Sequence, residues 1–165
     1  MSDTSVDYLV KRRVEFRDTD AAGIMHFSTF FTYMEEVEHE FLRSRGLSVV
    51  LPDRDSDESQ EGAKISWPRV AAKCDYQRAA KFEEILVIEI SIKNIGRTSI
   101  TYQFQFFAEN EGDRKADQKE QKGGAEERPL LATGELTAVC CRILPGKRPQ
   151  KITIPKEFRE KLLGN

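Results

Sequence analysis

The sequence predicts an α+β domain in which a curved, antiparallel five-stranded sheet wraps round one long central helix. Residues 27–45 repeat their apolar side chains with the period of a helix, whereas five other segments alternate apolar and polar residues as half-buried strands do. The last four strands follow one another through hairpin connections, which predicts antiparallel neighbours. One helix cannot cover both faces of such a sheet, so the sheet must curl round it or bury its bare face in a partner subunit.

Composition narrows the class of protein. The chain has 165 residues, the size of one domain, so we expect a single domain over 1–165. A net charge of −2 offers no basic field for nucleic acid, and no apolar run approaches the roughly 18 residues that a membrane span needs. The three cysteines are odd in number, and the first residues lack the apolar segment of a signal peptide. We therefore expect a cytoplasmic protein without a disulfide framework, a nucleic-acid partner or a membrane partner.

The first strand and the helix show the clearest patterns. Residues 8–17 alternate apolar and charged side chains and predict a strand. From Phe27 onward apolar residues recur at positions i, i+3, i+4 and i+7, which predicts an amphipathic helix. Ser28 or Thr29 is its candidate N-cap, and Gly46 can end it in the left-handed conformation.

The second half of the chain predicts four more strands. They lie at 70–77, 83–96, 97–107 and 130–142, with a hairpin turn at 94–96 and charged loops at 53–61 and 110–128. The loop 110–128 carries 11 charged residues in 19 and is expected to be mobile and to bury no core. Pro155 predicts the start of a short C-terminal helix over about 155–163.

The segment Asp-Thr-Asp-Ala-Ala-Gly, residues 18–23, stands where the first strand leads into the helix. D-x-D-x-x-G also opens a calcium loop, but Ala22 and Thr29 occupy positions that must supply oxygen ligands, so we predict no metal site. The two carboxylates come from one strand end, not from opposite sides of a cleft as in a glycosidase.

Two interpretations of the aspartates remain. Both side chains can simply end the strand by accepting hydrogen bonds from nearby backbone N–H groups. Asp20, however, lies a few residues before a helix N-terminus, where free N–H groups and the positive end of the helix dipole converge. A carboxylate beside such donors can act as a base or nucleophile next to an oxyanion hole.

The stretch VEFRDTDAAGIMHFSTFFTYMEEV, residues 14–37, resembles the hotdog-fold thioesterases of the 4-hydroxybenzoyl-CoA thioesterase branch. That family shows an aromatic residue before D-x-D-x-x-G, then two hydrophobic residues, an aromatic-rich helix start and a pair of acids. The predicted strand order is also the hotdog order, so the likeness covers about residues 8–145. The resemblance implies hydrolysis of an acyl-CoA thioester to a free acid and coenzyme A, without a cofactor or metal.

Within this resemblance, Asp20 corresponds to the catalytic aspartate, acting as nucleophile or as general base for water. Phe27 corresponds to the residue whose backbone N–H polarises the thioester carbonyl. Gly23 and His26 would contribute to the substrate site. The family often has Tyr-His-x-Asn at the helix start, where this chain has His-Phe-Ser-Thr, so the contact of that asparagine is missing.

The turn made by Gly96, Arg97, Thr98 and Ser99 is the candidate site for the phosphates of coenzyme A. It resembles the family's basic and polar turn between the two middle strands, and an arginine with hydroxyls can hold phosphate oxygens. A hairpin turn that happens to be basic is the alternative. The resemblance also implies a homodimer or homotetramer, because hotdog active sites are clefts shared between subunits.

Two other functions stay open at this point. A hotdog dehydratase or hydratase would use His26 as its base. A non-catalytic acyl-CoA binding module would leave Asp20 without a chemical role. The residues do not specify the acyl group.

Overall fold

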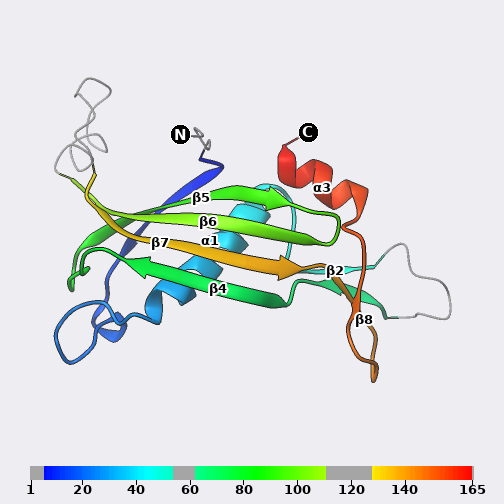
Figure 1. The fold of residues 1–165 in the computed structure, drawn as a ribbon, viewed down its shortest axis with the longest axis horizontal. Coiled ribbons are helices and arrows are strands. Elements are labelled where there is room, and N and C mark those ends of the chain that lie inside the picture. Colours follow the sequence, from blue (N-terminus) through cyan, green and yellow to red (C-terminus); the bar gives the residue numbers. More distant parts are fainter. Residues whose placement is uncertain (1–5, 54–61, 111–127, 165) are drawn as a thin grey trace.

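The computed structural model describes residues 6–53, 62–110 and 128–164 (Figure 1). Its larger sheet has five antiparallel strands in the order β1-β5-β6-β7-β4. These strands are β1 (Tyr8–Arg13), β4 (Arg69–Tyr76), β5 (Ile85–Ile95), β6 (Ser99–Ala108) and β7 (Leu130–Val139). The long helix α1 (Thr29–Ser44) contacts β1, β4, β5 and β7 and so lies across one face of the sheet. The α+β class, with one sheet packed round one long helix, is confirmed.

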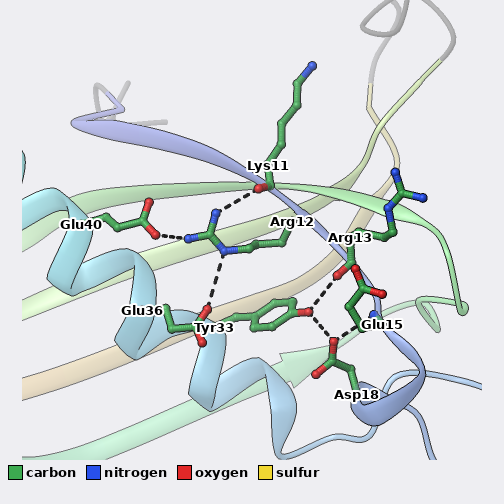
Figure 2. Close-up of polar contacts among 8 residues, drawn as sticks. All are labelled: Lys11, Arg12, Arg13, Glu15, Asp18, Tyr33, Glu36 and Glu40. Atoms are coloured by element: carbon green, nitrogen blue, oxygen red, sulfur yellow. Dashed lines mark hydrogen bonds and ion pairs between the residues drawn. The ribbon is translucent and has the colours of Figure 1, made fainter.

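The core lies between α1 and the sheet. Every second residue of β6 is fully buried there: Ile100, Tyr102, Phe104 and Phe106. A Cβ at Gly134 of β7 would overlap the sulfur of Met34, so the absence of a side chain lets the helix approach the sheet closely. Ion pairs from Arg12 of β1 to Glu36 and Glu40 also join one edge of the sheet to α1 (Figure 2).

A second sheet was not predicted from the sequence. It has four strands in the order β2-β3-β8-β9, which are β2 (Val50–Pro52), β3 (Lys64–Ser66), β8 (Cys141–Ile143) and β9 (Gln150–Lys151). Strands of two or three residues are too short to show an alternating pattern. The predicted strand 130–142 therefore ends at Val139, and the chain changes sheets at Cys140. All three cysteines are free thiols.

The predicted first strand was too long. β1 ends at Arg13, and Phe16–Asp18 form a single turn of 3-10 helix, η1. The alternating pattern continued past the strand because Val14 is still fully buried, but Phe16, which has the same parity, is exposed. The turn between β5 and β6 also lies later than predicted, at 96–98, because Ile95 still pairs with Ile100.

The C-terminal helix is confirmed as α3 (Lys156–Leu163), with Pro155 directly before its first residue. The predicted charged loops span 53–61 and 110–128, and their residues 54–61 and 111–127 lie outside the described part of the chain. The expected mobility of 110–128 therefore stays a prediction. Among the helices that the structure describes, none is long and apolar enough to span a membrane.

Candidate active site

Asp20 lies in a tight hairpin between η1 and α1. Thr19 and Met25 pair as an isolated antiparallel bridge. The Asp20 N–H donates to the Ile24 carbonyl at 2.9 Å, and the Gly23 N–H donates back to the Asp20 carbonyl at 3.0 Å. Gly23 has a φ of 74°, a left-handed conformation that glycine adopts at no steric cost. The structure thus shows Gly23 as the residue that shapes the hairpin; its predicted contact with substrate remains untested.

The carboxylate of Asp20 is partly exposed and uses one of its oxygens in the turn. Oδ1 accepts a hydrogen bond from the Ala22 N–H at 2.8 Å. Oδ2 has no partner within the described residues. One oxygen therefore holds the turn, while the other is available to a water molecule or a substrate, so both interpretations of this aspartate find support.

Asp18 is 8% exposed and anchors the hairpin to the rest of the fold. Its Oδ2 accepts from the Glu15 N–H at 2.9 Å and from the Tyr33 hydroxyl at 2.7 Å, and its carbonyl accepts from the His26 N–H at 2.8 Å. Figure 2 shows Tyr33 reaching from α1 to both the Asp18 carboxylate and the Arg13 carbonyl. Burial, and then the hydrogen bond to Asp18, raise the pKa of Tyr33, so its hydroxyl stays a donor.

Phe27, the predicted oxyanion donor, lies between the hairpin and α1. Its backbone N–H makes no hydrogen bond within the described part of the chain, whereas its carbonyl accepts from the Tyr76 hydroxyl at 2.9 Å. The Phe27 side chain is 62% exposed, so its predicted place on the buried face of the helix was wrong. The reason is that α1 begins only at Thr29. An unpaired backbone N–H of this kind can donate to an oxygen that gains negative charge.

His26 is held by the residue that begins the helix. Ser28, one of the two predicted candidates, occupies the N-cap position of α1, but its side chain makes no hydrogen bond to the first turn of the helix. Instead its Oγ lies 2.8 Å from Nδ1 of His26, and its N–H donates to the same nitrogen at 3.3 Å. Nδ1 is therefore the acceptor of the ring, which places the proton of the neutral imidazole on Nε2. The ring packs on that of Phe27, with 4.5 Å between the centroids.

Arg97 lies at the opposite end of the sheet from Asp20. The hairpin is next to the start of β5, because Ile24 bridges to Lys81, whereas the turn with Arg97 follows the end of β5. A strand of 11 residues spans roughly 35 Å. The hairpin and the turn after β5 therefore lie at opposite ends of the sheet (Figure 1), and one chain does not bring Asp20 and Arg97 together.

The turn that contains Arg97 packs against the C-terminal segment. The Arg97 carbonyl accepts from the Ile154 N–H at 2.9 Å, and Arg159 of α3 donates to the carbonyl of the preceding residue. The Arg97 side chain is exposed and has no partner within the described residues, while Thr98 and Ser99 are half-buried. A basic side chain is thus available to an anion at this turn.

An open pocket of about 530 Å³ lies at the same end of the molecule, beside the start of α3. Its lining residues are Asp53, Arg142, Ile152, Thr153, Ile154, Pro155, Lys156 and Arg159. Asp20 and Phe27 do not contribute to it, so this pocket is separate from the hairpin.

Sequence reasoning missed two tyrosines that hold the candidate site. The helical spacing of Tyr33 indicates burial on α1 but not the hydrogen bond to Asp18. Tyr76 bonds to Phe27 across 49 positions of the chain, and no local pattern could indicate that contact.

Comparisons with known proteins identify the family. The model of the Thioesterase superfamily matches residues 22–115. A protein of Aquifex aeolicus (strain VF5) is 30% identical over 112 residues, which cover 68% of this chain and 81% of that protein. The 1,4-dihydroxy-2-naphthoyl-CoA hydrolase of Prochlorococcus marinus (strain MIT 9313) is 30% identical over 103 residues, covering 62% of this chain and 68% of that one.

Solved structures agree with this result. The structure of 4-hydroxybenzoyl-CoA thioesterase from Pseudomonas sp. strain CBS-3 superimposes with a TM-score of 0.69 at 20% identity, covering 93% of this chain and 97% of that one. The chain belongs to the Thioesterase superfamily, and its architecture is the hotdog fold. The resemblance found in residues 14–37 is confirmed at the level of the family.

Proposed function

We propose that this chain hydrolyses an acyl-CoA thioester to a free acid and coenzyme A, and that the acyl group is aromatic. Family membership supports the reaction, and two similar proteins carry names that specify aromatic acyl-CoA substrates. The observation that carries the proposal is the hairpin itself. Asp20 Oδ2 and the Phe27 N–H both lack partners within the described residues, and both belong to one short segment anchored by Asp18.

In the proposed mechanism Asp20 activates water or attacks the thioester directly. As a general base it takes a proton from water, the water oxygen bonds to the carbonyl carbon, the C–S bond breaks, and the departing thiolate of coenzyme A takes up the proton. As a nucleophile its oxygen bonds to the carbonyl carbon while the C–S bond breaks and coenzyme A leaves, and water then hydrolyses the mixed anhydride and restores the carboxylate. A general base contributes on the order of 10²–10⁴ in rate. The Phe27 N–H would stabilise the oxygen as it becomes negative, which contributes about 3 kcal/mol.

The contacts of His26 favour hydrolysis over dehydration. A dehydratase base needs an unprotonated nitrogen that faces the substrate. Nδ1 of His26 is occupied by Ser28, and the other nitrogen carries the proton in the neutral ring. We therefore assign His26 a place beside the substrate rather than the role of base.

We further propose that the active unit is a homodimer, or a homotetramer built from such dimers. β4 is an edge strand, and most of its side chains are exposed, including the apolar Val70. Two-fold pairing of β4 with its copy would be antiparallel, which sets the Tyr76 end of one strand beside the Arg69 end of the other. The hairpin lies at the Tyr76 end, and the Arg97 turn lies on the side of Arg69. Pairing would thus bring the Arg97 of one chain toward the Asp20 of its partner.

Light scattering tests the dimer. We expect at least twice the chain mass of 18.9 kDa at micromolar concentration, whereas a single species near 18.9 kDa would contradict it. The cytoplasm remains the proposed compartment, since all three cysteines are free thiols.

A substrate panel with detection of the released thiol tests the reaction. It should contain 1,4-dihydroxy-2-naphthoyl-CoA, 4-hydroxybenzoyl-CoA and short and long aliphatic acyl-CoAs. We expect fastest release from an aromatic thioester. Hydration of crotonyl-CoA without thiol release would favour the dehydratase, and binding of acyl-CoA without turnover would favour the non-catalytic module.

A further inference from the structure

The carbonyl of Phe27 is held by a side chain rather than by the helix that follows it. The hydroxyl of Tyr76 donates to this carbonyl at 2.9 Å. The first turn of α1 does not use it, because the Phe31 N–H donates to the Ser28 carbonyl at 3.1 Å. The N–H and the carbonyl of Phe27 therefore differ: the first is unpaired within the described residues, and the second has a fixed partner from β4.

Tyr76 is held by its strand and by ring packing, although its side chain is 45% exposed. It is the last residue of β4, and its backbone pairs with Ala132 of β7. Its ring meets that of Phe30 edge to face, with 5.2 Å between the centroids, and Phe30 in turn packs on Phe106 of β6 at 5.1 Å. Burial, and then the neighbouring Cys74 side chain, raise the pKa of Tyr76 to about 12. The hydroxyl therefore keeps its proton at neutral pH and donates it.

We propose that Tyr76 is a positioning residue for the oxyanion donor, because its hydroxyl fixes the orientation of Phe27 and thus the direction of the Phe27 N–H. This inference rests on the proposed function, in which that N–H meets the thioester carbonyl. Only two backbone torsions separate the N–H and the carbonyl of one residue, so a fixed carbonyl restricts the direction of the N–H. Without the hydroxyl the N–H is still present but points at the substrate for less of the time.

A less well oriented Phe27 N–H should weaken stabilisation of the transition state rather than substrate binding, because the hydrogen bond is strongest when the carbonyl oxygen carries negative charge. Tyr76→Phe keeps the ring and its contact with Phe30 and removes only the hydroxyl. Tyr8→Phe is the matched control, since Tyr8 packs its ring on Phe41 from β1, at the other edge of the sheet.

With 4-hydroxybenzoyl-CoA as substrate, we expect Tyr76→Phe to lower kcat about tenfold, less than the roughly 10²–10³ that loss of an oxyanion donor costs. KM should stay within twofold, and Tyr8→Phe should match the wild type. A kcat unchanged in Tyr76→Phe would overturn the inference. No hydrolysis of any aromatic thioester of the panel by the wild type would contradict the proposed function and this inference with it.

A spectroscopic measurement distinguishes the effect of Tyr76 on the Phe27 N–H from the role of Asp20 in catalysis, because it needs no turnover. The probe is a ¹³C-labelled ketone analogue of 4-hydroxybenzoyl-CoA, with a methylene group in place of the thioester sulfur. We expect its carbonyl stretch to fall on binding to the wild type and to Tyr8→Phe, and to return toward the solution value in Tyr76→Phe. Equal frequencies in all three proteins would show that the hydroxyl does not position the donor, even if Asp20 proves essential.

Discussion

The hydroxyl of Tyr33 lies 2.7 Å from Oδ2 of Asp18 and so joins the second turn of α1 to the hairpin that carries Asp20. Asp18 is buried, and burial of a carboxylate costs free energy unless the group accepts hydrogen bonds. The Tyr33 hydroxyl and the Glu15 N–H both donate to Oδ2 and offset that cost (Figure 2). Asp18 therefore anchors the strand-to-helix junction to α1, while Asp20 holds the turn through Oδ1 only and keeps Oδ2 available for the proposed chemistry.

Asp18→Asn should destabilise the fold by about 1 kcal/mol, because the neutral amide is a weaker acceptor for its two donors. Tyr33→Phe should have a similar effect, since it removes one of those donors. Denaturant unfolding measures both, with Tyr8→Phe as the control. Hydrolysis per folded molecule should stay within tenfold of the wild type for Asp18→Asn. Unchanged stability, or activity lost from a folded protein, would show that Asp18 has another role.

Glu38 is a second buried carboxylate. It lies on α1 with 1% exposure, where one oxygen bonds to Arg69 and the other has no partner within the described residues. Burial raises the pKa of Glu38 from 4.5 to about 7, although the nearby Arg69 lowers it. His39, which lies 3.3 Å from Arg69, has its pKa lowered by burial.

We expect Glu38 to reduce stability as the pH rises from about 4.5 to about 7. In that range the folded state keeps a proton that the unfolded state has lost, so the free energy of unfolding falls with pH. The lowered pKa of His39 has the opposite effect, because it makes the free energy of unfolding rise with pH. The quantity to compare is therefore the difference in the free energy of unfolding between the wild type and Glu38→Gln at each pH. That difference should change across this range. A flat difference for Glu38→Gln would show that its pKa is not raised.

Arg97 and Asp20 should act on one substrate from two different chains. Arg97→Ala should raise KM for acyl-CoA with little change in kcat, because a phosphate contact is equal in the ground and transition states. A thioester of the short pantetheine arm, which lacks the phosphates, should be insensitive to the same change.

Mixing two variants tests whether one active site is formed by Asp20 of one chain and Arg97 of the other. In a heterodimer of Asp20→Asn and Arg97→Ala, one site would combine the intact Asp20 of one chain with the intact Arg97 of the other. We therefore expect a mixed, re-equilibrated sample to recover the low KM in a fraction of its sites. Kinetics that stay those of Arg97→Ala would show that Arg97 acts within its own chain or outside the site.

The long elements could be predicted because their periods repeat over enough residues. β6 alternates buried and half-buried side chains throughout, and α1 buries Phe30, Met34, Val37 and Phe41 at helical spacing. The second sheet could not be predicted, since its strands are held by pairings such as Lys64 with Ile143, which lie far apart in the sequence.

The candidate site could be located from the sequence, but its contacts could not. D-x-D-x-x-G marks a turn before a helix, and Gly23 with its positive φ forms that turn. Nothing local shows that Asp18 is paired to Tyr33 or that Phe27 is held by Tyr76, because those bonds depend on how α1 and β4 pack. Asp20 and Arg97 are likewise far apart because β5 runs from one end of the sheet to the other. The sequence pattern predicted this strand, but it did not show that the strand separates the two candidate residues.

Asp20→Asn tests the central claim most directly, because the amide keeps the volume and an oxygen for the Ala22 N–H but loses the charge and the basicity. We predict that kcat falls by roughly 10² or more while acyl-CoA still binds and the thermal midpoint barely falls. Asp18→Asn provides the matched control from the same hairpin. Full hydrolysis by folded Asp20→Asn would show that this carboxylate only holds the turn, and would make His26 the next residue to replace.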